Sequence, residues 1–142
     1  MLRSLLIPTV VLAGAIVLLL SGFAKAQDMA AFESMVRSHA LLTGPEILPW
    51  ASRGVPAVEV AGAALAVLWL LRKRPRPALL LLALIAAALA FYALALVIEP
   101  PPAPAKCGCG VLRGSDAADW TFISTTNFLA AAALSLLRAF VK

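Results

Sequence analysis

The chain has 142 residues, of which 63% are hydrophobic and 13% charged, and its formal net charge at pH 7 is +5. This apolar share exceeds that of soluble domains, and apolar runs of about 20 residues predict transmembrane helices. The basic residues lie beside these runs, where they set membrane orientation, so we expect a lipid bilayer and no nucleic acid as partner. The runs leave no room for a separate soluble domain, which predicts a single membrane domain over residues 1–142.

The first apolar run covers about 5–23 and follows Arg3. A cleavable signal peptide is the alternative, because Ala24-Lys25-Ala26 has the small-x-small pattern of a cleavage site. The run is longer than the apolar core of a signal peptide, which has about 7–15 residues. We therefore expect it to be retained as the first membrane span.

A short amphipathic helix is predicted at about 28–42, directly after the first span. Asp28 can cap its first turn, and Glu33 and Arg37 are spaced to form an i,i+4 ion pair. One face carries Met29, Phe32, Met35 and Val36. These features are typical of a helix that lies in the membrane interface with its apolar face toward lipid. His39, at the apolar edge, is interpreted as part of this packing.

Three further apolar runs predict three more spans, at about 55–71, 78–98 and 121–141. Pro49 and Trp50 lead towards the second span, with Trp50 at the depth where aromatic belts form. A segment at about 99–120, rich in proline and glycine, separates the last two spans and contains the cysteines. The predicted fold class is therefore all-α, a four-helix transmembrane bundle with one interfacial helix.

Four basic residues between the second and third spans predict the membrane orientation. They are Arg72, Lys73, Arg74 and Arg76. Such a dense cluster is typical of a cytoplasmic turn, so both termini should be cytoplasmic, and the amphipathic helix and the cysteine loop should lie outside. In a bacterium this predicts a multi-pass protein of the inner membrane with the loop in the periplasm, where disulfides persist.

Glu59 is the only carboxylate inside a predicted span. An acid in hydrocarbon costs a few kcal/mol, so it should face the bundle and have a partner. Ser21, Tyr92 and Asn127 are expected at similar depth in the other spans, and Lys25 is within snorkelling reach. Two interpretations remain open, polar contacts that hold the helices together and a functional polar cluster beneath the cysteine loop.

Cys107 and Cys109 are the only cysteines, and they are separated by one glycine. The first interpretation is a redox-active dithiol, because flanking Lys106 and Arg113 favour the thiolate and a disulfide closed across one residue is strained and easily reduced. A static disulfide and a soft-metal site for Cu(I) are the alternatives. With the dithiol as the leading interpretation, we expect no cofactor and no metal.

Several short motifs occur in the same order along the chain. They are Ser21-Gly22-x-x-Lys25, Asp28-x-x-x-Phe32, Pro56-x-x-Glu59-x-x-Gly62 and Cys107-Gly108-Cys109-Gly110. With this ordered set the chain resembles the MauE/DoxX-type membrane proteins. The resemblance implies a four-helix membrane bundle that helps to mature or assemble periplasmic redox proteins. The family often has an aromatic residue after the second cysteine, where this chain has Gly110-Val111.

The leading functional hypothesis is thiol–disulfide exchange with a periplasmic or membrane protein partner, in which one cysteine forms a mixed disulfide and the other resolves it. Glu59, with Tyr92 and Asn127, would hold the outer ends of the helices or tune the thiols. The chain lacks a second cysteine pair, which excludes electron transfer to a quinone through two internal pairs. The alternative is a non-catalytic, structural subunit of a larger membrane complex, so enzymatic activity stays open.

Overall fold

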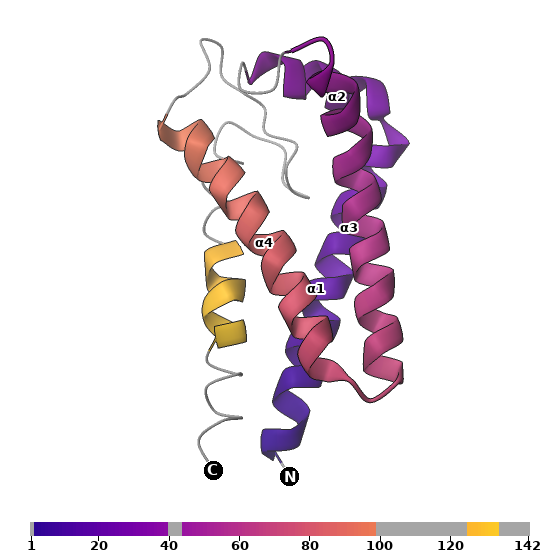
Figure 1. Cartoon of the computed structure of the whole chain (residues 1–142), viewed down its shortest axis with the longest axis vertical. Coiled ribbons are helices and arrows are strands. Elements are labelled where there is room, and N and C mark those ends of the chain that lie inside the picture. Colours follow the sequence, from indigo (N-terminus) through magenta and orange to yellow (C-terminus); the bar gives the residue numbers. More distant parts are fainter. Residues whose placement is uncertain (1, 40–43, 99–124, 134–142) are drawn as a thin grey trace.

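The computed structural model describes residues 2–39, 44–98 and 125–133, and all regular structure within these ranges is α-helical. The helices are α1 (Leu2–Gln27), α2 (Met29–Ser38), α3 (Ile47–Leu71), α4 (Pro75–Ile98) and an unlabelled helical segment over 125–133 (Figure 1). The cysteine loop at about 99–120 lies outside the described residues, as does most of the predicted fourth span.

Three helices are long and apolar enough to cross a membrane by length and composition. These stretches are Leu6–Gln27 in α1, Ile47–Leu71 in α3 and Pro75–Leu96 in α4. Large apolar side chains such as Val17, Leu84 and Phe91 are exposed on the outside of the bundle, as expected for helices that contact lipid. The all-α class and three of the predicted spans are therefore confirmed, whereas the count of four spans is not.

The second span begins earlier than predicted, at Ile47 instead of about residue 55. The prediction treated Pro49 and Trp50 as a segment leading to the span, but both lie in the first turn of α3. A proline is tolerated there, because the first backbone N–H groups of a helix have no partner within the helix. The helix that carries the second span therefore begins about two turns before the predicted start of the span.

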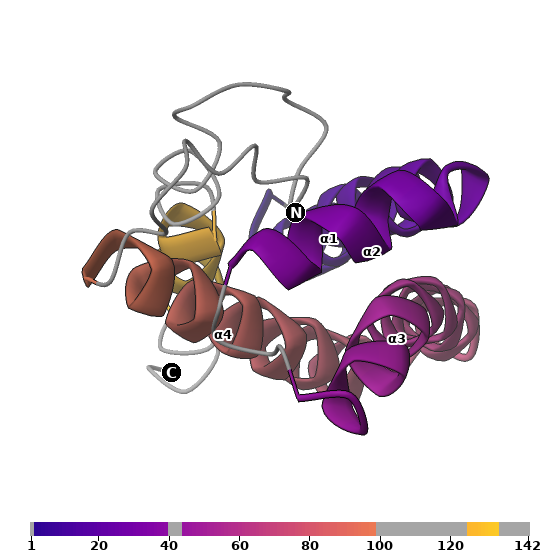
Figure 2. The same ribbon diagram turned by 90° about the horizontal axis from the view of Figure 1, so that it is seen from above.

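Half of the buried residues in the core cluster of α1, α3, α4 and the segment 125–133 are alanines, which let the helices approach closely. Its buried members include Val11, Ala15, Ala63, Ala66, Ala78, Leu79 and Leu82. A Cβ atom built on Gly62 of α3 would lie 2.4 Å from Ile85 Cδ1 of α4, so these two helices are in close contact. Helix α4 runs obliquely across the other two (Figures 1 and 2).

Helix α2 has the local features that its sequence predicts. The side chain of Asp28 accepts a hydrogen bond from the backbone N–H of Ala31 at 3.1 Å, which caps the helix. Arg37 Nη2 lies 3.1 Å from Glu33 Oε1, so the i,i+4 ion pair is confirmed. Both features depend only on neighbours within one helix turn.

The apolar face of α2 packs against protein. Phe32 and Val36 are buried in a cluster with Leu48 of α3, and Met35 packs beside them. The prediction that this face lies against lipid is therefore wrong at its two central residues. The reason is the early start of α3, since the two turns added before residue 55 reach far enough to cover α2.

A buried polar site at the α2 end of the bundle

One end of the bundle contains α2, the last turns of α1, the first turns of α3 and the last turns of α4 (Figure 1). We call this the α2 end. It holds all five buried polar or charged side chains of the described residues, namely Ser21, Lys25, His39, Ser52 and Glu59. In an apolar bundle, buried polar groups need partners. Four of these side chains form two separate groups.

The first group is an ion pair between Lys25 of α1 and Glu59 of α3. The Nζ of Lys25 donates a hydrogen bond to Glu59 Oε1, and the two side chains are only 3% and 1% exposed. Ser21 lies one helical turn before Lys25, and its hydroxyl donates to the same Oε1 at 3.4 Å. Two donors from α1 therefore converge on one carboxylate oxygen of α3.

Gly22 allows the two helices to approach closely enough for this pair to form. A Cβ atom at Gly22 would lie 2.7 Å from Val60 Cγ2, 3.1 Å from the Pro56 carbonyl oxygen and 3.2 Å from Glu59 Cβ. The motif around Ser21 and the motif around Glu59 thus form one contact between α1 and α3. Their order along the chain gives no hint of this adjacency.

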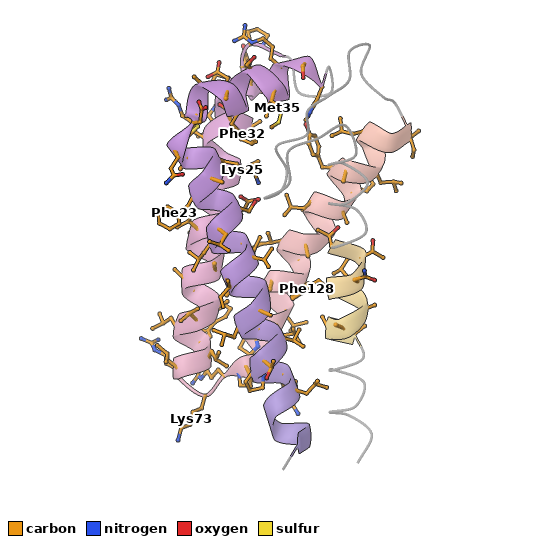
Figure 3. The ribbon with its side chains drawn as sticks, turned by 180° about the vertical axis from the view of Figure 1, so that it is seen from behind. Phe23, Lys25, Phe32, Met35, Lys73 and Phe128 are labelled. Carbon is orange, nitrogen blue, oxygen red and sulfur yellow. The ribbon has the colours of Figure 1, made fainter. Side chains whose placement is uncertain are left out.

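Lys25 also brings α2 into the group. Its Nζ lies 5.6 Å from the centroid of the Phe32 ring, at a distance typical of a cation–π contact. Figure 3 shows Lys25, Phe32 and Met35 close together at the α2 end, with Lys73 at the opposite end. The buried cation therefore contacts side chains of two other helices.

The second group joins α2 to α4. The Nδ1 atom of His39, the C-cap of α2, lies 2.8 Å from the hydroxyl oxygen of Tyr92, and the ring centroids are 5.9 Å apart. His39 is only 1% exposed. The interpretation of His39 as amphipathic packing missed this bond. A usable signal was present, because the chain has one histidine and one tyrosine, and both were expected near the same membrane surface.

The predicted polar cluster is therefore only partly assembled. Ser21 and Lys25 meet Glu59, whereas Tyr92 bonds to His39. Asn127 is exposed on the segment 125–133, whose Phe128 ring packs at Gly14 of α1. Gly14 lies seven residues before Ser21, or about 10 Å along the helix. The expected depth of Asn127 was wrong for this reason.

Each group retains one uncommitted polar atom. Within the described part of the chain, Glu59 Oε2 and His39 Nε2 are buried and have no hydrogen-bond partner. A carboxylate oxygen can accept a hydrogen bond or a proton. The Nε2 atom of a neutral imidazole donates a hydrogen bond in one tautomer and accepts one in the other. The site can therefore take up one further polar contact at each group.

Burial lowers the pKa of His39 from its ordinary value of 6.5, so the ring is neutral at pH 7. The unfolded chain takes up a proton near pH 6.5 that the folded chain excludes. We expect stability to be complete above about pH 6.5 and to decrease as the pH falls below it. Melting temperatures measured between about pH 8 and 5 test this. His39→Gln should remove that part of the pH dependence, and an unchanged profile would contradict the assignment.

A metal site is not formed by the described residues, where no three His, Cys, Asp or Glu side chains are grouped to hold an ion. Cys107 and Cys109 lie outside this part of the chain. The soft-metal alternative for the cysteine pair is therefore not tested by the structure.

Three membrane-length helices, two of which are joined by a buried ion pair, define a multi-pass α-helical membrane protein. The model of a family described as "Methylamine utilisation protein MauE" matches residues 3–138. The chain therefore belongs to the MauE family, which confirms the resemblance. Membership links this membrane protein to methylamine utilisation. No curated protein and no solved structure shows a significant match to the chain.

Proposed function

We propose that this membrane protein offers Cys107 and Cys109 for thiol–disulfide exchange with a partner protein during the maturation or assembly of redox proteins. Membership of the MauE family supports this proposal, as does the single glycine between the two cysteines. The partner is a periplasmic or membrane protein that contains disulfides. The cysteine loop faces the periplasm, and both termini are cytoplasmic.

The proposal rests mainly on one structural observation, the bracing of the α2 end. Helix α4 ends at Ile98 at this end of the bundle, and Cys107 follows nine residues later in the sequence. The His39–Tyr92 hydrogen bond joins α4 to α2, and the Lys25–Glu59 pair joins α1 to α3. Functional groups are positioned best when the elements that carry them are rigid. The His39–Tyr92 bond fixes α4 to α2 six residues before the end of α4, which supports a functional role for the segment that follows.

The exchange step needs no electron donor or acceptor besides the two proteins. The thiolate of one cysteine attacks a sulfur of the partner's disulfide, a mixed disulfide forms and the partner's other sulfur leaves as a thiolate. The second cysteine then attacks its neighbour's sulfur in the mixed disulfide. The Cys107–Cys109 bond closes, and the partner is released with two thiols. The partner has gained two electrons and this chain has lost two, and the reverse sequence oxidises the partner.

Trapping of the mixed disulfide tests this function. One of the single variants Cys107→Ser and Cys109→Ser should accumulate a covalent adduct in native membranes, because the resolving thiol is missing. The adduct should disappear on reduction, and the double variant should form none. The midpoint potential of the wild-type pair should lie above about −230 mV, as in exchange catalysts.

A different result would support the structural-subunit alternative. A pair that stays oxidised below about −300 mV behaves as a structural disulfide. Together with the absence of adducts in both single variants, that value would contradict the exchange function.

A further inference from the structure

The turn between α3 and α4 lies at the end of the bundle opposite α2 (Figure 1). It consists of Arg72, Lys73 and Arg74, which are the only residues between the two membrane-length helices. All three are exposed. Since the flanking helices are both apolar enough to cross the bilayer, three connecting residues must lie at one membrane surface, among the lipid headgroups.

The backbone of this turn is closed by its own hydrogen bonds. The N–H of Lys73 donates to the Leu70 carbonyl at 3.0 Å, and the N–H of Arg74 donates to the Trp69 carbonyl at 2.8 Å. Lys73 adopts a left-handed conformation with φ of 57°. Glycine is the usual residue in this conformation at the end of a helix, because a Cβ atom is unfavourable there. In this chain a lysine occupies the position, and it is the one non-glycine residue with positive φ in the described part of the chain.

The cations of the turn have no acidic residue near them in the sequence. No Asp or Glu occurs between Glu59 and Glu99. Pro75 and Pro77 open α4 and lack N–H groups, so few backbone amides point from its first turn toward the surface. Proline also fixes φ at both positions, which restricts the backbone where the turn joins α4.

We propose that the α3–α4 turn binds the phosphate diester of an anionic phospholipid headgroup. The guanidinium groups of Arg72 and Arg74 have the forked geometry that suits phosphate oxygens, and the ammonium group of Lys73 adds a third positive charge to the same turn. The location of the turn among headgroups favours a lipid over free phosphate as the source of this group. The site does not depend on the exchange proposed for Cys107 and Cys109.

Lipid titration of the purified full-length chain in neutral detergent micelles tests this site, with bound lipid counted by native mass spectrometry. Phosphatidylglycerol should bind in preference to phosphatidylcholine. Arg72→Gln/Arg74→Gln should weaken phosphatidylglycerol binding about thirtyfold, from about fivefold for each charge. The matched control Arg37→Gln/Arg53→Gln removes two exposed charges elsewhere and should change binding less than twofold.

Lys73→Gly separates lipid binding from folding. Glycine adopts a φ of 57° without a steric penalty from a Cβ atom, so this variant should fold at least as well as wild type. Because it lacks one positive charge, it should bind phosphatidylglycerol about fivefold more weakly. Unchanged lipid binding by this variant, or equal losses in the two double variants, would overturn the site. Displacement of the lipid by equimolar inorganic phosphate would overturn the choice of a lipid as ligand.

Discussion

Lys25→Ala is expected to lower the free energy of unfolding by about 3–5 kcal/mol, the range for breaking a buried ion pair. The Glu59 side chain is 1% exposed in the intact pair, and the variant leaves it with the 3.4 Å contact from Ser21 as its remaining donor among the described residues. A buried charge without its counterion is strongly unfavourable in an apolar bundle. Reversible unfolding in mixed micelles of sodium dodecyl sulfate and a neutral detergent measures the change.

The chain offers a matched control in its exposed ion pair. Arg37→Ala removes the partner of Glu33 on the surface of α2, and an i,i+4 pair of this kind contributes about 0.3–0.5 kcal/mol. The double variant Lys25→Met/Glu59→Leu removes both buried charges and should recover most of the loss. If Lys25→Ala lowers the free energy of unfolding by no more than Arg37→Ala does, the buried pair does not stabilise the fold.

Gly22→Ala should destabilise the bundle by about 1–3 kcal/mol, as overpacking of a close contact does. The new methyl group would lie 2.7 Å from Val60 Cγ2 and 3.1 Å from the Pro56 carbonyl oxygen. The valine side chain can adjust, but the backbone oxygen of α3 cannot move without moving the helix. The same micelle unfolding experiment measures the loss, which should be accompanied by weakening of the Lys25–Glu59 contact.

Gly54→Ala is the control for this prediction, because no atom lies within 4 Å of a Cβ at that position of α3. Alanine is the better helix former by about 1 kcal/mol, so this variant should be neutral or more stable. The change in stability caused by Gly62→Ala should lie between those of Gly22→Ala and Gly54→Ala, since the closest contact of a Cβ at Gly62 is the flexible end of Ile85. Equal effects of Gly22→Ala and Gly54→Ala would contradict the close approach of α1 and α3.

Local sequence patterns predicted the features of this fold that depend on neighbours in the chain. The apolar runs located α1 and α4, and spacing alone identified the Asp28 cap and the Glu33–Arg37 pair. The start of α3 was missed because Pro49 and Trp50 were interpreted as a segment leading to the span, although a proline fits the first turn of a helix. That one error also left the apolar face of α2 without its actual partner.

The partners of the buried polar groups could be predicted only in part. Position along a span gives depth in the membrane, and depth correctly placed Ser21 and Lys25 near Glu59. Depth does not specify which helix faces meet. Similar depth grouped Tyr92 with Glu59 in the prediction. In the structure, Tyr92 of α4 instead bonds to His39 at the end of α2. Contacts between elements far apart in sequence are set by packing that a single sequence does not display.

The pairing of residue 25 with residue 59 also bears on how the chain enters the membrane during synthesis. Helix α1 leaves the ribosome first, and it carries Lys25 near its end. Helix α3 follows with Glu59, whose transfer into hydrocarbon would cost a few kcal/mol if it were alone. Because α1 precedes α3 and carries the Lys25 cation and the Ser21 hydroxyl that contact Glu59, we expect α3 to insert beside α1 at a lower free-energy cost than α3 alone.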